Sequence, residues 1–87
     1  LVVHAGDTIT FENLTGEVVT LKFPAGLFDL KNATTEEMGT GGAAGKTFFT
    51  VPEEAIPDTY HYDVKGADGE TDMIKSSPRI IVKPPSN

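Results

Sequence analysis

The stretch Thr59-Tyr60-His61-Tyr62-Asp63-Val64 decides the fold class of this chain. Tyr60, Tyr62 and Val64 alternate with polar residues, and a period of two is typical of a strand with one buried face. The two tyrosines give that face a large apolar area. The strand leads into an acidic loop, residues 65–77. We therefore expect the far end of this strand, at Val64, to decide which chemistry the protein can perform.

Segments with the same alternation lie on both sides of this strand. They predict further strands at residues 1–4, 8–12, 18–23, 46–51 and 78–83. Turn and breaker residues separate them, among them Gly6 in a tight turn and Pro24 after the third strand. Short strands at this spacing indicate an all-β chain folded as an antiparallel Greek-key β-sandwich.

The segment 26–45 has no strand pattern and is expected to be irregular. Within it, Thr34 and Glu37 have the spacing of a capping box, so a short helical turn is expected near residues 34–38. Gly39 would end that turn.

The alternation also predicts which side chains form the core. The expected buried residues are Ile9, Phe11, Val19, Leu21, Phe23, Phe48, Tyr60, Tyr62, Val64, Ile80 and Val82. Phe49 follows Phe48, and only one of these two rings can point inward.

Composition limits the range of functions. The 87 residues suit one domain, expected at 1–83 with a tail or linker stub at 84–87. Net charge is −6, which argues against a nucleic-acid partner. No stretch has the length of a membrane span or the pattern of a signal peptide, so no membrane insertion is expected. The chain contains no cysteine and starts at Leu1 rather than Met, as a mature product or excised domain would.

Three segments in the same order resemble cupredoxins, the plastocyanin-like blue copper proteins. They are Ala5-Gly6-Asp7-Thr8-Ile9-Thr10-Phe11-Glu12-Asn13, Asp58-Thr59-Tyr60-His61-Tyr62 and Arg79-Ile80-Ile81-Val82. The second resembles the family's Gly-Thr-Tyr-x-Phe/Tyr run, with Asp58 in place of the glycine. The resemblance implies a cupredoxin-like fold and a periplasmic or extracellular location.

The copper ligands of the family do not carry over. The family's first histidine falls on Val19, its cysteine on Val64 and its second histidine on Ala67, while Met73 could correspond to the axial methionine. A blue copper site needs two histidines and a thiolate, and methionine is only a weak axial ligand. The resemblance therefore implies a cupredoxin fold without metal or other cofactor, closed at that end by hydrocarbon.

Other candidate sites are weaker. His4 and His61 are the only histidines, and the family pattern puts them on separate surfaces. The acidic residues Asp63, Asp68, Glu70 and Asp72 offer hard oxygen ligands for weak cation binding, but their spacing fits no EF-hand loop. Asn13 and Asn32 each stand in a glycosylation pattern.

No arrangement of residues indicates an enzyme. We expect a copper-free binding or structural module of an exported protein, whose partner is an unidentified protein or a neighbouring domain. Two alternatives stay open: a copper-binding electron-transfer protein with a misaligned or atypical site, and an immunoglobulin-like adhesion module. Sheet topology bears on the second, because a cupredoxin pairs its first strand in parallel with a later one.

Overall fold

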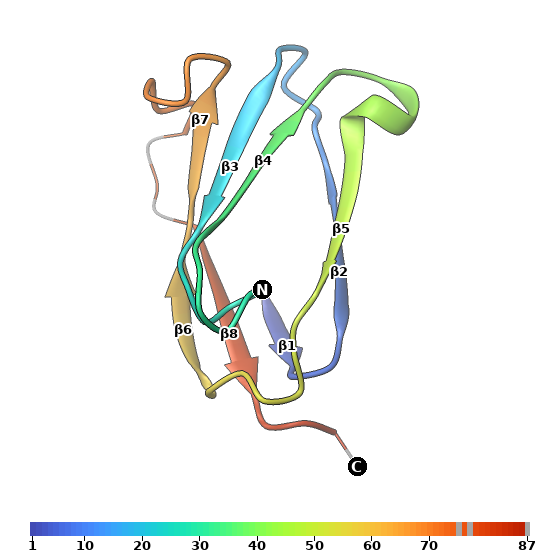
Figure 1. Ribbon diagram of the computed structural model, residues 1–87. Coiled ribbons are helices and arrows are strands. Elements are labelled where there is room, and N and C mark those ends of the chain that lie inside the picture. The colour runs from blue at the N-terminus through green and yellow to red at the C-terminus, as the bar shows by residue number, and fades with distance from the viewer. Residues whose placement is uncertain (75, 77, 87) are drawn as a thin grey trace.

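The computed structural model describes residues 1–74, 76 and 78–86. The predicted acidic loop and tail therefore include three residues, Lys75, Ser77 and Asn87, that lie outside the described part. Within these described residues, eight strands and one 3-10 turn follow one another along the chain (Figure 1). The elements are β1 (Val2–His4), β2 (Thr8–Glu12), β3 (Val19–Phe23), β4 (Thr34–Met38), η1 (Gly42–Gly45), β5 (Lys46–Thr50), β6 (Asp58–His61), β7 (Asp63–Gly66) and β8 (Arg79–Lys83). The all-β class expected from the sequence is confirmed.

The strands form three small sheets, ordered β1-β8-β6, β2-β5 and β4-β3-β7. In Figure 1 the β2-β5 pair lies on the right and the β4-β3-β7 sheet on the left, with β1, β6 and β8 in the lower half. Among the pairings of the described strands, β1 with β8 alone is parallel, with Val3 opposite Val82. The two ends of the chain thus meet in one sheet.

The stretch 58–66 pairs first with one sheet and then with another. β6 pairs with β8, and Tyr60 lies opposite Ile80. β7 pairs with β3, and Val64 lies opposite Leu21. Tyr62 belongs to neither strand, and its backbone N–H donates to the carbonyl of Pro78 over 3.0 Å. The prediction of one uninterrupted strand at 59–64 is therefore wrong. Both tyrosine side chains nevertheless pack against the core, on the side that the alternation predicts.

The prediction of a helical turn near residues 34–38 is wrong. These residues form β4, which pairs antiparallel with β3 from Val19–Met38 to Phe23–Thr34. The edge of β3 offers backbone hydrogen bonds along five residues, whereas a capping box would satisfy only a single helical turn. Met38 is buried while Glu37 is exposed, which is the alternation of a strand at a sheet edge.

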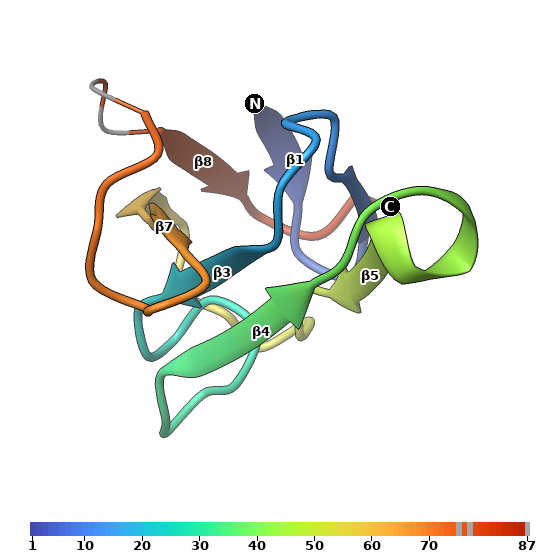
Figure 2. The same ribbon diagram turned by 90° about the horizontal axis from the view of Figure 1, so that it is seen from above.

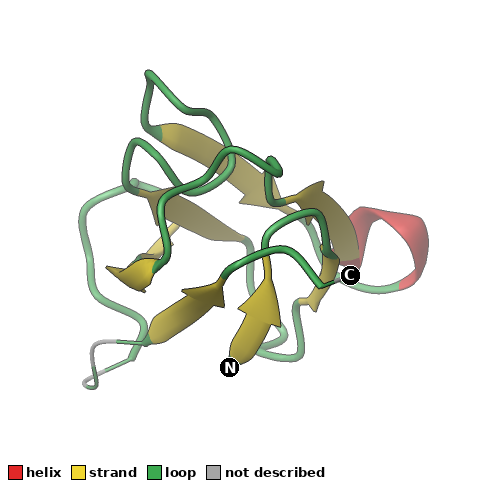
Figure 3. Ribbon diagram, turned by 90° about the horizontal axis from the view of Figure 1, so that it is seen from below, coloured by secondary structure: helices red, strands yellow, loops and turns green. Residues whose placement is uncertain are grey.

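The helical turn of this region lies further along, at η1. It closes with the Gly45 N–H donating to the Gly41 carbonyl over 3.1 Å, and Gly41 and Gly42 have φ values of 70° and 53°. Glycine is needed there because side chains disfavour positive φ. Figure 3 shows this turn as the one helical segment, and Figure 2 places it at the margin beside β5. No helix in the described ranges is long and apolar enough to cross a membrane.

The core lies between two facing sheets, the β2-β5 pair and the β4-β3-β7 sheet (Figure 1). The β1-β8-β6 sheet adds Val3, Ile80 and Val82 to it. Of the predicted core residues, Ile9, Val19, Leu21, Phe23, Ile80 and Val82 are buried, and Phe11, Tyr60, Tyr62 and Val64 are half-buried. The prediction that Phe48 is buried is wrong, because its side chain is 71% exposed and Phe49 packs on the core instead. Burial also includes residues that alternation did not single out, namely Val3, Ala5, Leu27, Met38, Val51 and Ala55.

Five aromatic rings join the two facing sheets. The Phe23 ring of β3 lies 5.3 Å from that of Phe11 in β2, 5.5 Å from that of Phe49 in β5 and 5.1 Å from that of Tyr62, between ring centroids. Phe28 stacks on Phe49 at 4.8 Å. Tilted and edge-on pairs at these distances add to the stabilisation that burial of the rings provides.

Candidate functional site

An apolar pocket of about 380 Å³ opens between β2, β3 and the stretch 58–66. Its walls come from both facing sheets and from the loop after β7. The apolar residues that line it are Phe11, Leu14, Val19, Leu21, Met38, Tyr62, Val64 and Ile74. Pockets lined mainly by hydrocarbon with a few polar groups are the usual form of small-molecule sites.

The alternation of β3 supplies the inner wall. Val19 and Leu21 are two residues apart and so point to the same side of the sheet, and both are buried. The register places Val64 opposite Leu21 and Gly66 opposite Val19. Val64 therefore reaches the same wall as Leu21, while Gly66 adds no side chain there. Met38 lies opposite Val19 on the other flank.

Asn13 forms the polar corner of the pocket. Its side-chain amide donates to the carbonyls of Glu17 and Gly39 over 2.7 and 2.8 Å. Its carbonyl oxygen accepts from the backbone N–H of Thr15 at 3.0 Å and from the Thr15 hydroxyl at 2.7 Å. Both amide hydrogens and both lone pairs are thereby used, so this buried group holds the loop between β2 and β3 against the end of β4.

The mouth of the pocket exposes apolar side chains. Leu14 is 83% exposed and Ile74 is 37% exposed. At the same margin Glu12 pairs with Lys46 across β2 and β5, with 3.6 Å between carboxylate oxygen and ammonium nitrogen. Surface pairs of this kind contribute little stability. The rim is therefore hydrocarbon on one side and a weak, solvated ion pair on the other.

Tyr62 brings a hydroxyl to the pocket wall. Burial raises the pKa of this hydroxyl above its usual value. It makes no hydrogen bond to any residue that the structure describes, in contrast to the Tyr60 hydroxyl, which donates to the Ile56 carbonyl over 2.6 Å. The protonated phenol can donate one bond and accept others.

The four positions that the resemblance aligns with copper ligands fall into two places. Val19 and Val64 line the apolar pocket. Ala67 and Met73 line a separate, more polar hollow of about 470 Å³, which also contains Asp68. Aliphatic side chains donate no lone pair, so the residues present at Val19, Val64 and Ala67 do not fit a blue copper ion.

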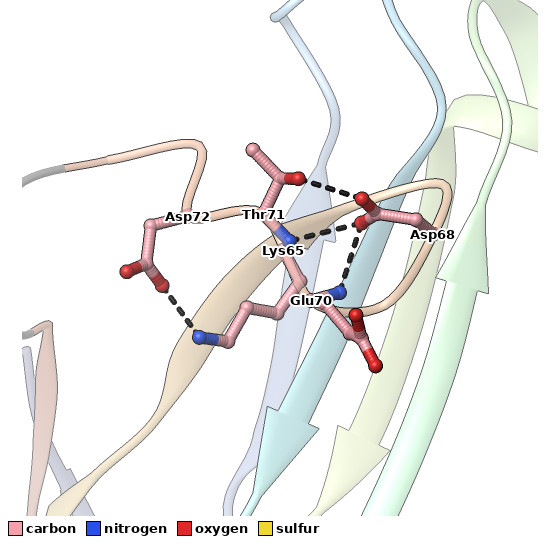
Figure 4. Close-up of polar contacts among 5 residues, drawn as sticks. All are labelled: Lys65, Asp68, Glu70, Thr71 and Asp72. Atoms are coloured by element: carbon pink, nitrogen blue, oxygen red, sulfur yellow. Dashed lines mark hydrogen bonds and ion pairs between the residues drawn. The ribbon is translucent and has the colours of Figure 1, made fainter.

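The acidic loop is held by its own hydrogen bonds (Figure 4). The Asp68 carboxylate accepts from the Thr71 hydroxyl at 2.6 Å and from the N–H groups of Thr71 and Glu70, each at 2.9 Å. These bonds, that of the Thr71 hydroxyl foremost, lower the pKa of Asp68 to about 2. The fold therefore uses this carboxylate to close a turn.

The other cation candidates have different surroundings. Lys65 donates to Asp72 over 2.5 Å, and this bond raises the pKa of the lysine. Asp63 begins β7 opposite Lys22 and is exposed. In the part of the chain that the structure describes, no three His, Cys, Asp or Glu side chains are grouped so that they could hold a metal ion.

The two histidines lie at opposite ends of β8. His4 lies opposite Lys83, and its Nδ1 is 2.9 Å from the Pro84 carbonyl, so this nitrogen carries the proton. His61 lies opposite Arg79. The structure does not bring these two side chains together.

Sequence reasoning singled out Val19 and Val64 as positions that the resemblance aligns with copper ligands, but it did not predict the pocket that both residues line. The pattern Asn13-Leu14-Thr15 was available as a signal, since Asn and Thr in this spacing also form a local turn. The amide of Asn13 is fully used inside the fold, whereas Asn32 is exposed in the loop before β4. The pocket needs long-range register, which no local pattern contains.

No protein-family model, curated protein or solved structure matches this chain.

Proposed function

We propose that this chain is a cupredoxin-like Greek-key β-sandwich that works as a copper-free binding or structural module of an exported protein. The observation that carries the proposal is the apolar character of Val19 and Val64, which line one pocket where the resemblance requires a histidine and a cysteine. In this proposal the module is not an enzyme, and its location is periplasmic or extracellular.

Two features of the strand arrangement support the cupredoxin-like part of the proposal. β1 pairs in parallel with β8, as the resemblance requires of a first and a later strand. The stretch 58–66 then connects the sheet of β8 to the sheet of β3 and sets Val64 opposite Leu21. This crossing suits the position that the resemblance gives to the family's cysteine. The parallel pair departs from the fully antiparallel sandwich that the strand pattern alone predicts.

The chemistry of the ligands supports the copper-free part. The intense colour of blue copper requires a thiolate, and this chain has no cysteine. Its only sulfur atoms belong to Met38 and Met73, whose uncharged thioethers bind Cu(II) weakly. A hydrocarbon-lined pocket with an exposed rim suits the burial of an apolar group of a ligand or partner.

The proposal is tested by titrating the protein with Cu(II), dialysing it, and recording bound copper and the visible spectrum. We expect a colourless protein that loses its copper. The double variant His4→Ala/His61→Ala is the control, and it should lower the weak binding before dialysis, because that binding is to exposed imidazoles. One retained copper per chain with a strong absorption band would contradict the proposal and favour electron transfer.

A further inference from the structure

We propose that the pocket between β2, β3 and the stretch 58–66 binds one small, uncharged aromatic molecule. This inference rests on the proposed binding function and names the class of ligand. It starts from the pocket's size, its wall chemistry and the charges beside it, none of which depends on the copper comparison.

The size of the pocket selects a ligand of one or two rings. Its volume is about 380 Å³. An engineered apolar protein cavity of roughly 150 Å³ already holds benzene, so this pocket has room for one ring with a substituent or for two fused rings. An extended peptide would need a longer groove, with a pocket at every second residue.

The walls favour an aromatic ring over other apolar shapes. Phe11 and Tyr62 both line the pocket, and their ring centroids lie 6.1 Å apart at an interplanar angle of 74°. A third ring placed beside such a pair can meet one face and one edge at once, the two arrangements that aromatic pairs prefer. Met38, on the flank, adds a polarisable sulfur that suits contact with a ring edge.

The charges favour an uncharged ligand. Glu12 lines the pocket, and no lysine, arginine or histidine does so among the described residues. Lys46 pairs with Glu12 at the margin but does not line the pocket. Among the described lining residues, a carboxylate would be desolvated with no cation beside it, so its binding is disfavoured. The net charge of −6 also disfavours the binding of an anionic ligand.

The test is an NMR titration of the isotope-labelled chain with three probes of nearly equal size: benzyl alcohol, benzoate and cyclohexylmethanol. For benzyl alcohol we expect saturable shifts at Val19, Leu21 and Val64, with a Kd of the order of millimolar for so few heavy atoms. Benzoate should bind about tenfold more weakly or worse. Cyclohexylmethanol should bind about threefold more weakly, because it lacks the ring contacts.

Variants locate the site. Val64→Phe adds a ring to the wall and should abolish saturable binding. Val64→Leu is a milder change, used in case Val64→Phe does not fold, and it should weaken binding. Phe48→Ser is the matched control. It removes an aromatic ring that is 71% exposed on β5 and does not line the pocket, so it should leave the Kd unchanged.

Three results would overturn the inference: shifts that do not saturate, benzoate or cyclohexylmethanol binding as tightly as benzyl alcohol, and both Val64 variants binding like the parent chain. Failure here is distinguishable from failure of the proposed function. If the protein is colourless and copper-free but does not bind benzyl alcohol, only the inferred ligand class is wrong. If it retains copper with a strong absorption band, the proposed function itself is wrong.

Discussion

At the scale of single residues, Asn13 shows how one polar side chain fixes a loop that lines the pocket. It is buried, and every hydrogen-bonding position of its amide group is occupied. Such groups are costly to remove, because the partners they leave behind are desolvated and unpaired. The partner groups that would lose a bond are the carbonyls of Glu17 and Gly39 and the N–H and hydroxyl of Thr15.

Replacing Asn13 with alanine should therefore lower the free energy of unfolding by about 1–3 kcal/mol. Urea denaturation measures this directly. Asn32→Ala is the control, since Asn32 is exposed, and it should change stability by about 0.5 kcal/mol or less. Equal effects of the two substitutions would show that the Asn13 network is not formed.

Asp68 gives a second prediction, about pH. Its pKa in the folded chain is about 2, below the ordinary aspartate value of 3.8, because the Thr71 hydroxyl and two backbone N–H groups bind the charged form. A depressed folded-state pKa means that the contribution of this turn is fully present above pH 3.8 and is lost as the pH falls through about 2.

Carboxyl chemical shifts in an NMR pH titration should show a midpoint for Asp68 of about 2. Thr71→Val removes the hydroxyl donor and keeps the side-chain shape, so it should raise that midpoint. A parent-chain midpoint at the ordinary aspartate value of 3.8 would mean that the turn drawn in Figure 4 is open in solution.

At the scale of elements, β4 (Thr34–Met38) shows why packing decides between strand and helix in a short segment. The local signal of Thr34 and Glu37 favours a helical turn, but pairing with β3 satisfies more backbone groups and buries Met38. Tertiary context commonly overrides so short a local preference.

Met38→Ala should then cost about 2–5 kcal/mol of the free energy of unfolding, as expected for truncation of a buried side chain. Glu37→Ala, its exposed neighbour in the same strand, should stay within about 0.5 kcal/mol. Denaturant titrations of both variants test the alternation. A small loss for Met38→Ala would contradict the strand assignment.

Sequence patterns predicted the elements with strong alternation. The strand at 8–12 matches β2 in both bounds, and those at 1–4, 18–23, 46–51 and 78–83 match within a residue. The break at Tyr62 was not predictable, because Tyr60, Tyr62 and Val64 keep a period of two on both sides of it. The change of sheet depends on which partners stand beside the chain, and a local period carries no such information.

At the scale of the whole molecule, almost every pairing joins distant parts of the chain. β1 pairs with β8, β2 with β5, and β7 returns to β3. Loop-closure entropy must be overcome before these contacts stabilise the fold. The pocket depends on the same pairings, which is why Val19 and Val64 could be identified from the sequence but the cavity they share could not.

Folding should accordingly be slow for 87 residues, on the order of milliseconds to seconds. Stopped-flow refolding from urea measures the rate, and the Pro-containing segments can add a slower phase of tens of seconds. Refolding complete well within a millisecond would contradict a topology dominated by distant strand pairs.

The central claim is that Val64 faces the pocket rather than solvent, and cross-strand nuclear Overhauser effects test it most directly. The structure predicts contacts in the register Leu21–Val64, together with contacts from the Val64 methyl groups to the rings of Phe11 or Tyr62. A slip of one residue would turn Val64 outward and place Asp63 or Lys65 opposite Leu21. Contacts in that shifted register, with Val64 methyl groups distant from both rings, would contradict the account.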